Sequence, residues 1–255
     1  MTVAVDVRPD AHRATITFDR PEVKNAMSMA MVEEVRDVVR ETAARDAVRV
    51  VVLTGSGDTF CAGADFEEFG ARADDPAAEL EYIRTTDEVK RAIETCEVPV
   101  VAKLNGAAVG LGAEIALASD IRVACHDASL TLGEINVALV PPFERLSKNL
   151  SDALVRELCF TGNDLAASKA FEADVYNRLV DRAELDAATE EIVDPIAEKS
   201  PHALEQTKRA FKASEGKSLD ESNEFRYLLD YQCFDHPDFR ESIDAISEGR
   251  EPDYT

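Results

Sequence analysis

The chain contains no tryptophan, and aromatic residues occupy only 6% of its 255 positions. It also lacks long hydrophobic runs, since no stretch approaches the roughly 18 apolar residues of a membrane-spanning helix. Residues 1–6 carry neither the basic segment nor the apolar segment of a secretory signal. We therefore expect no membrane span, no secretion signal and a cytoplasmic location.

Basic residues are scarce, with 28 Lys and Arg against 51 Asp and Glu, so the formal net charge is −23. This charge is spread along the whole chain and disfavours nucleic acid and anionic membranes as partners. Acidic residues dominate the polar helix faces, as in residues 32–37. Such a surface is typical of halophilic proteins, because at 1 M salt repulsion is screened within about 3 Å. An acidic protein of low-salt origin is the alternative.

Cysteine and histidine give no sign of a metal site. The five cysteines form no C-x-x-C motif and mostly have apolar neighbours, and the four histidines show no ligand-like spacing. We expect reduced core thiols and no bound metal.

The apolar content of 45% and the length of the chain fit one sizeable core with a smaller appendage. In the first two thirds, short β-like runs alternate with amphipathic helical patterns, which predicts an α/β fold with a mainly parallel sheet. Ser28 is the expected N-cap of the first helix. The expected strands are 3–7, 14–18, 49–54, 98–103 and 121–125, and the expected helices are 28–42 and 79–96.

From residue 152 onward the pattern is mostly helical. Because helices without intervening strands cannot extend a sheet, we expect them to pack on the sheet, on each other or on a neighbouring subunit. Residues 71–77 are the expected mobile loop. The predicted helices are 152–160, 164–170, 182–199, 201–212 and 218–234.

Two glycine-rich turns could bring backbone amides to a ligand. Gly63 lies among the small residues of the segment 60–65, where the N–H of Ala64 is free to bind an oxygen. The second turn, 106–112, leads into a helix whose N-terminus favours negative charge. Each turn could instead serve only close packing, and the second does not match the dinucleotide-binding pattern G-x-G-x-x-G.

Glu114 and Glu134 both lie in largely apolar stretches. A carboxylate in such a setting is costly unless it is paired or protonated, so these two predict acid/base chemistry. Since residues three apart share a helix face, the Leu111 amide and the Glu114 carboxylate are expected to face the same cavity. Helix capping or solvated surface charge is the alternative for both glutamates.

These motifs together resemble the crotonase superfamily, the enoyl-CoA hydratase/isomerase family, over essentially the full length. Several ordered motifs at family-like spacing carry the resemblance. They are residues 16–21 with 25–27, 51–55 with 60–65, 105–114, 119–124 and 158–162.

The resemblance implies a crotonase-like (β-β-α)n spiral core with a helical C-terminal region. Residues 1–195 would form the core with the CoA-thioester site, and residues 196–255 a helical trimerisation region. Trimers would pair into hexamers. No cofactor is expected, because coenzyme A is part of the substrate.

The resemblance also assigns roles to residues. The amides of Ala64 and Leu111 would form an oxyanion hole for the thioester carbonyl, and the pair of glutamates would activate a water that adds to C3 while a proton reaches C2. Coenzyme A would be held by Ala62, Ala64, Leu111, Asp65 and Phe66, with Lys24 near a phosphate.

The chain departs from the family pattern after Glu134. Residues 139–146 replace the proline and glycine pair that opens a helix in many hydratases, so Phe143 or Glu144 is expected to enter the acyl pocket. Asp58 and Glu67 stand where some relatives carry lysines near the CoA phosphates.

Hydration of a 2-enoyl-CoA is the leading prediction. A shift of the double bond between C3 and C2 is its close rival, followed by thioester hydrolysis, decarboxylation and ring-forming Claisen chemistry. From another class, the chain could be a non-catalytic or RNA-associated family member, a hypothesis that tight RNA binding in a low-salt filter assay would support.

Overall fold

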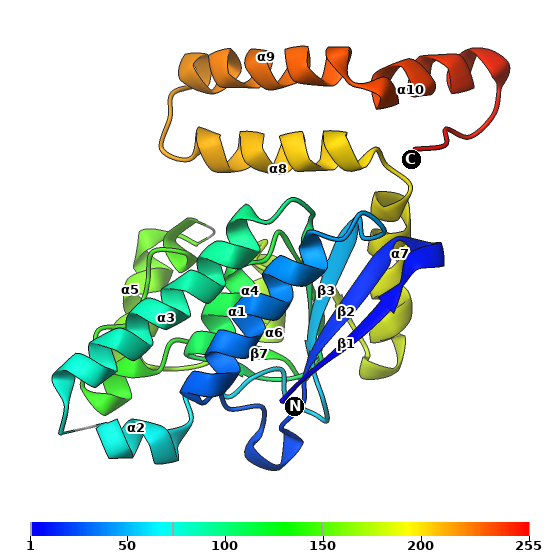
Figure 1. The fold of residues 1–255 in the computed structure, drawn as a ribbon. Helices are drawn as coiled ribbons and strands as arrows, with labels where there is room; N and C mark the ends of the chain where they lie inside the picture. Colours follow the sequence, from blue (N-terminus) through cyan, green and yellow to red (C-terminus); the bar gives the residue numbers. More distant parts are fainter. Residues whose placement is uncertain (1, 73, 149, 255) are drawn as a thin grey trace.

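The computed structural model describes residues 2–72, 74–148 and 150–254, and these form an α/β body with a layer of helices on one side (Figure 1). The larger sheet has the strand order β1-β2-β3-β4-β6-β9, in which only the β1–β2 pair is antiparallel. The mainly parallel sheet is confirmed. Its strands are Val3–Arg8, Arg13–Phe18, Val50–Gly55, Val100–Leu104, Ile121–Cys125 and Arg178–Val180, in the order β1, β2, β3, β4, β6 and β9.

A second sheet contains β5 (Ala108–Val109), β7 (Ser129–Thr131) and β8 (Leu165–Ala166). The chain passes from β4 to β5 and then through a helix to β6 and β7. Each repeat of the spiral therefore places one strand in each sheet. An isolated parallel bridge between Cys61 and Ala108 extends this two-sheet pattern to the preceding repeat of the spiral. The predicted strand-strand-helix spiral is confirmed.

The core helices cover both faces of the large sheet. In Figure 1, α1 and α3 lie on one side of β1–β3, and α7 lies on the other. Ser28 caps α1 by accepting a hydrogen bond from the Met31 amide, as predicted. The helices are α1 (Met29–Ala43), α2 (Phe66–Arg72), α3 (Pro76–Thr95), α4 (Leu111–Ala118), α5 (Asp152–Thr161), α6 (Ala167–Glu172) and α7 (Leu185–Ala197).

All eight residues of α4 are buried, as expected for a helix that is apolar on nearly every side. Short 3-10 helices fill several connections. They are η1 (Pro9–Ala11), η2 (Pro21–Val23), η3 (Glu134–Val137), η4 (Leu146–Lys148) and η5 (Arg182–Glu184).

The region after residue 152 is mostly helical as predicted, but the helix predicted over 164–170 is only partly correct, and two short strands interrupt the region. The segment 164–170 begins as strand β8, and only its second half belongs to α6. Further on, β9 extends the large sheet by pairing in parallel with β6. Both strands are so short, at two and three residues, that they carry no recognisable alternation of apolar and polar positions.

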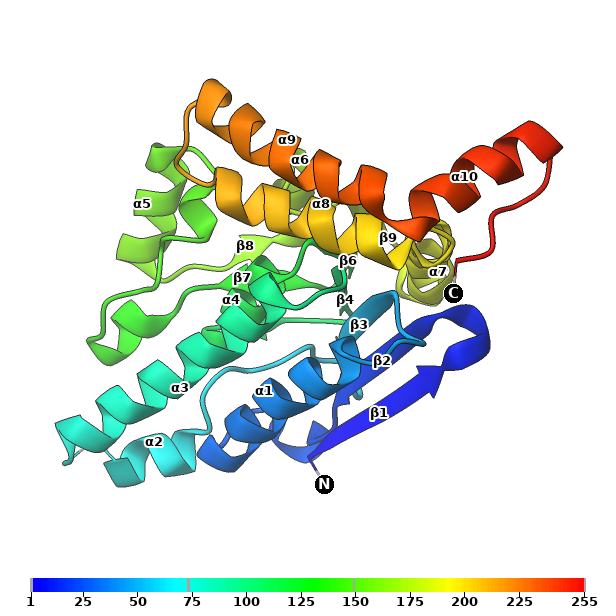
Figure 2. The ribbon, with the colours of Figure 1, turned by 45° about the horizontal axis from the view of Figure 1, so that its top comes forward.

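Three C-terminal helices form the outer layer: α8 (Pro201–Ser214), α9 (Leu219–Asp235) and α10 (Pro237–Glu248). The buried Lys208 ties α8 to the core, because its ammonium donates to the Ile93 and Val98 carbonyls at 2.7 and 2.9 Å and pairs with Asp120 at 2.8 Å. Helix α9 lies outside α8 (Figure 2). The layer exposes large apolar side chains, namely Phe211, Leu219, Tyr227, Leu228, Tyr231, Phe234, Phe239, Ile243 and Ile246.

The cysteines are unpaired, with Cys61, Cys125 and Cys159 buried and Cys96 and Cys233 half-buried. Among the described residues, no helix has the length and apolarity to cross a membrane. The expected loop 71–77 is shorter than predicted, because α2 ends at Arg72 and α3 begins at Pro76. Residue 73 of that loop lies outside the described residues.

We predict that salt stabilises this fold. Raising KCl from about 0.1 M to about 2 M shortens the screening length from roughly 10 Å to a few ångströms, which weakens repulsion among the acidic side chains. The melting temperature measured by circular dichroism should therefore rise. Chloride is the suitable anion, because sulfate strengthens apolar burial in any protein. A melting temperature that is flat or falls with KCl would argue against a halophilic surface.

Candidate active site

A close backbone contact joins the two glycine-rich turns. Gly63 has φ of +90°, and a Cβ at this position would lie 2.7 Å from the Val109 carbonyl oxygen. Next to it, the Val109 amide donates to the Cys61 carbonyl at 2.9 Å. Only glycine permits both the dihedral angle and the approach. The contact therefore holds the turn that contains Ala64 against the turn that leads into Leu111, the first residue of α4.

The amides of Ala64 and Leu111 have no hydrogen-bond acceptor within the described parts of the chain. Met27 fixes the backbone on either side of Ala64, since its amide donates to the Gly63 carbonyl at 2.8 Å and its carbonyl accepts from Asp65 at 3.1 Å. The Ala64 N–H consequently points away from Met27. Leu111 is unpaired because the first amides of a helix have no intrahelical acceptor.

Glu114 lies on α4 and is buried. Its Oε2 atom contacts the ammonium of Lys90, a buried residue of α3. Lys90 also pairs with Asp87 at 2.8 Å. Burial raises the pKa of Glu114, while the Lys90 charge opposes that rise.

Glu134 begins η3 and approaches the second turn from the other side. A Cβ on Gly110 would lie 3.1 Å from Glu134 Oε1, so the carboxyl group packs against this turn. Its Oε2 atom is buried and has no hydrogen-bond partner among the residues that the structure describes. Burial raises the pKa of Glu134, its own backbone amide opposes the rise, and the charge of Glu114 adds to it. The two glutamates are thus electrostatically coupled.

The residues expected to hold coenzyme A lie along one stretch beside these amides. Lys24 is exposed, and its carbonyl accepts from the Ala62 amide at 3.0 Å. Asp65 has structural partners, because it pairs with Arg20 at 3.0 Å and accepts from the Glu67 amide at the start of α2. The ring of Phe66 is exposed. The structure brings these residues together, and contact with coenzyme A remains a prediction.

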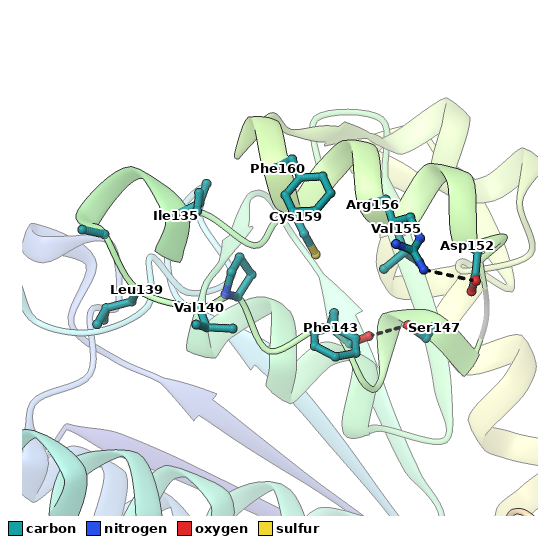
Figure 3. A pocket seen from close by; sticks show the side chains of 12 residues that line it. Ile135, Leu139, Val140, Phe143, Ser147, Asp152, Val155, Arg156, Cys159 and Phe160 are labelled. Carbon is teal, nitrogen blue, oxygen red and sulfur yellow. Dashed lines mark hydrogen bonds and ion pairs between the residues drawn. The ribbon is translucent and has the colours of Figure 1, made fainter.

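A cavity of about 500 Å³ lies beside η3 and is lined by η3, α5 and the segment between them (Figure 3). It adjoins Glu134 through Ile135 and through Cys159, whose thiol has its pKa raised by burial and by the Glu134 charge. Phe143 lines this cavity, whereas Glu144 does not. Ala64 and Leu111 are not part of its wall. The lining residues are Ile135, Ala138, Leu139, Val140, Pro141, Phe143, Ser147, Asp152, Val155, Arg156, Cys159 and Phe160.

The sequence patterns did not single out Lys90. It lies within the predicted helix 79–96, whose buried face includes Thr86, Val89 and Ile93. A lysine next to Val89, four residues after Thr86 and three before Ile93 falls on that apolar face, and this position is the signal that would have identified it.

The fold is an α/β spiral in which two amides without acceptors lie in adjoining glycine turns, and two electrostatically coupled carboxyl groups lie nearby. Such groups are typical of enzymes that stabilise an oxyanion during proton transfer. The family model described as "Enoyl-CoA hydratase/isomerase" matches residues 10–255, and the chain belongs to this family.

Individual relatives agree with this membership. The chain is 30% identical over 241 residues to the short-chain-enoyl-CoA hydratase of Clostridium acetobutylicum, covering 93% of this chain and 92% of that protein. It is 29% identical to the mitochondrial Delta(3,5)-Delta(2,4)-dienoyl-CoA isomerase of Pongo abelii, covering 94% and 77%. The crystal structure of an enoyl-CoA hydratase from Bacillus anthracis superposes with a TM-score of 0.92 at 29% identity, covering 100% and 99%.

We predict that Gly63→Ala destabilises the fold by about 1–3 kcal/mol. A positive φ is unfavourable for alanine, and the added Cβ would clash with the Val109 carbonyl oxygen. The free energy of unfolding in urea is the measurement. Gly70→Ala is the matched control, because nothing lies within 4 Å of a Cβ there and alanine favours its helix. Equal stability of the two variants would show that the contact at Gly63 is relaxed.

Proposed function

We propose that this protein catalyses the reversible hydration of a 2-enoyl-CoA thioester to a 3-hydroxyacyl-CoA. The observation that carries the proposal is the placement of the Glu134 carboxyl group against the Gly110 turn, electrostatically coupled to Glu114. The names of several relatives, such as the hydratase of Clostridium acetobutylicum, support the same reaction.

In the proposed reaction, the thioester oxygen accepts hydrogen bonds from the Ala64 and Leu111 amides. These bonds strengthen as the oxygen gains enolate charge, and one such donor is typically worth about 2.7–4 kcal/mol in the transition state. An ionised glutamate removes a proton from water as the water oxygen bonds to C3. The other glutamate, protonated, supplies the proton that C2 gains, so that the elements of water add across the double bond.

The remaining predicted contacts complete the proposed site. Lys24, Ala62, Asp65 and Phe66 would lie along the CoA arm, with coenzyme A acting only as part of the substrate. The apolar cavity behind Glu134 would accept the part of the acyl chain beyond C4. If it does, kcat/KM should be higher for longer enoyl esters than for crotonyl-CoA.

We predict that Glu134→Gln lowers hydratase activity by about 10²–10⁴-fold, because a glutamine amide cannot exchange the required proton. Loss of the conjugated thioester absorbance of crotonyl-CoA in high salt is the measurement. Glu144→Gln is a suitable control, since this exposed residue does not line the cavity.

The same variant separates hydration from the rival isomerase reaction, which one glutamate can support. A Glu134→Gln protein that no longer hydrates crotonyl-CoA but still converts a 3-enoyl-CoA to its 2-enoyl isomer would identify an isomerase. Wild-type protein that hydrates no enoyl-CoA of any chain length would contradict the proposal.

We also propose that residues 196–255 act as a trimerisation region and that the cytoplasmic protein forms trimers or hexamers. The exposed apolar side chains of α8–α10 support this proposal, because a set of this size is characteristic of a covered surface.

Light scattering should give three or six times the chain mass of 27.9 kDa. Replacing the exposed Tyr231 and Phe234 by serine should lower that mass, whereas serine at the exposed Phe66 of α2, outside this layer, should not. A monomeric wild-type protein in both low and high salt would refute the assembly.

A further inference from the structure

Lys90 is a buried cation inside the candidate active site. Only 4% of its side chain is exposed, and its ammonium lies between Glu114, 9% exposed, and Asp87, 63% exposed. Glu114 projects from α4, whereas Asp87 and Lys90 both belong to α3. The contact with Glu114 therefore links two helices.

The Lys90 side chain is far more buried than the lysine of an ordinary surface ion pair. A lysine paired with an exposed aspartate would usually extend its ammonium into water, because removing a charge from water costs several kcal/mol. Lys90 instead turns inward to a carboxylate on another helix. A buried ion pair adds little net stability on average, so stability alone does not account for its position.

Two other charged groups near Glu114, Arg145 and Asp87, have opposite effects on its ionisation. Arg145, from the segment before η4, also favours the charged form of Glu114, but its guanidinium pairs with Glu94 at 2.8 Å. Asp87 disfavours the charged form. Lys90 is thus a cation that an ion pair joins directly to Glu114.

Glu134 is half-buried; burial and the Glu114 charge raise its pKa, and the charge of Lys90, which makes no ion pair with it, opposes the rise. Within the described residues its carboxyl group pairs with no cation, and its buried Oε2 atom has no partner. A partly desolvated carboxyl group next to another negative charge tends to hold its proton, because two adjacent carboxylates in a site of low polarity repel each other.

We propose that Lys90 is a positioning residue that keeps Glu114 ionised as the base for water and thereby leaves Glu134 as the protonated group that supplies C2. Lys90 acts through Glu114 and does not touch the reacting atoms. This inference rests on the proposed hydration, and it adds a third, cationic member to the pair of glutamates.

The test is the pH profile of kcat/KM for crotonyl-CoA hydration. The acidic limb of this profile reports the pKa of the base, Glu114. In Lys90→Met, Glu114 loses its cation, so the acidic limb should move to higher pH by about one unit or more. At a fixed pH on the acidic limb, activity should therefore fall about tenfold or more, and it should recover at higher pH. Lys90→Arg should restore the wild-type limb, because it returns the positive charge.

Lys208→Met is the matched control. Lys208 is also buried, but its partners are Asp120, the Cys96 sulfur and the Ile93 and Val98 carbonyls. Its loss should lower stability and leave the acidic limb in place. A Lys90→Met limb that coincides with that of wild type would overturn the inference while leaving the hydratase proposal intact.

Asp87→Asn provides a test that does not depend on removing a buried residue. Because the exposed Asp87 disfavours the charged form of Glu114, its neutralisation should move the acidic limb slightly in the other direction, to lower pH. An upward shift would contradict the inference.

If wild-type protein shows no hydration, the proposed function fails, and the inference is still testable by nuclear magnetic resonance. The Glu114 carboxyl carbon, assigned by its loss in Glu114→Gln, should titrate at higher pH in Lys90→Met than in wild type. Identical titration in the two proteins would overturn it.

Discussion

The contact between Gly63 and the Val109 carbonyl is the constraint on which the site depends. It holds two turns from successive repeats of the spiral at backbone distance, and no side chain fits between them. Because the amides on either side are positioned by the main chain, their geometry is independent of the side chains at Ala64 and Leu111. A leucine at the start of α4 is consequently as suitable as any other residue for presenting an N–H group.

The fold places unlike environments around two identical side chains. Glu114 is anchored to α3 through Lys90, whereas Glu134 packs its carboxyl group against a glycine turn and leaves one oxygen unpaired. Proton transfer in both directions needs one acid and one base at the same pH, and environments that separate the two protonation states supply them. The conformational freedom of Gly110 permits this close packing, since its φ is +50°.

The fold could be predicted well from the sequence wherever apolar periodicity was long. The N-cap at Ser28 and the five longer strands of the first two thirds follow from local patterns, and the spiral follows from the family resemblance. The short strands β5, β7, β8 and β9 could not be predicted, because two or three residues define no period and their pairing is set by tertiary contacts. Glu114 and Glu134 were found because they interrupt apolar stretches. Lys90 interrupts one as well, but its partner is on another helix, and a single sequence does not reveal that pairing.

The central claim is that the Ala64 and Leu111 amides polarise a thioester carbonyl, and vibrational spectroscopy of a bound ligand tests it most directly. A saturated acyl-CoA labelled with ¹³C at the thioester carbonyl binds without reacting, so its stretching band reports the hydrogen bonds that the oxygen receives. The account predicts that this band moves to lower frequency on binding than it has in water. A band at or above its frequency in water would show that no oxyanion hole forms at these amides.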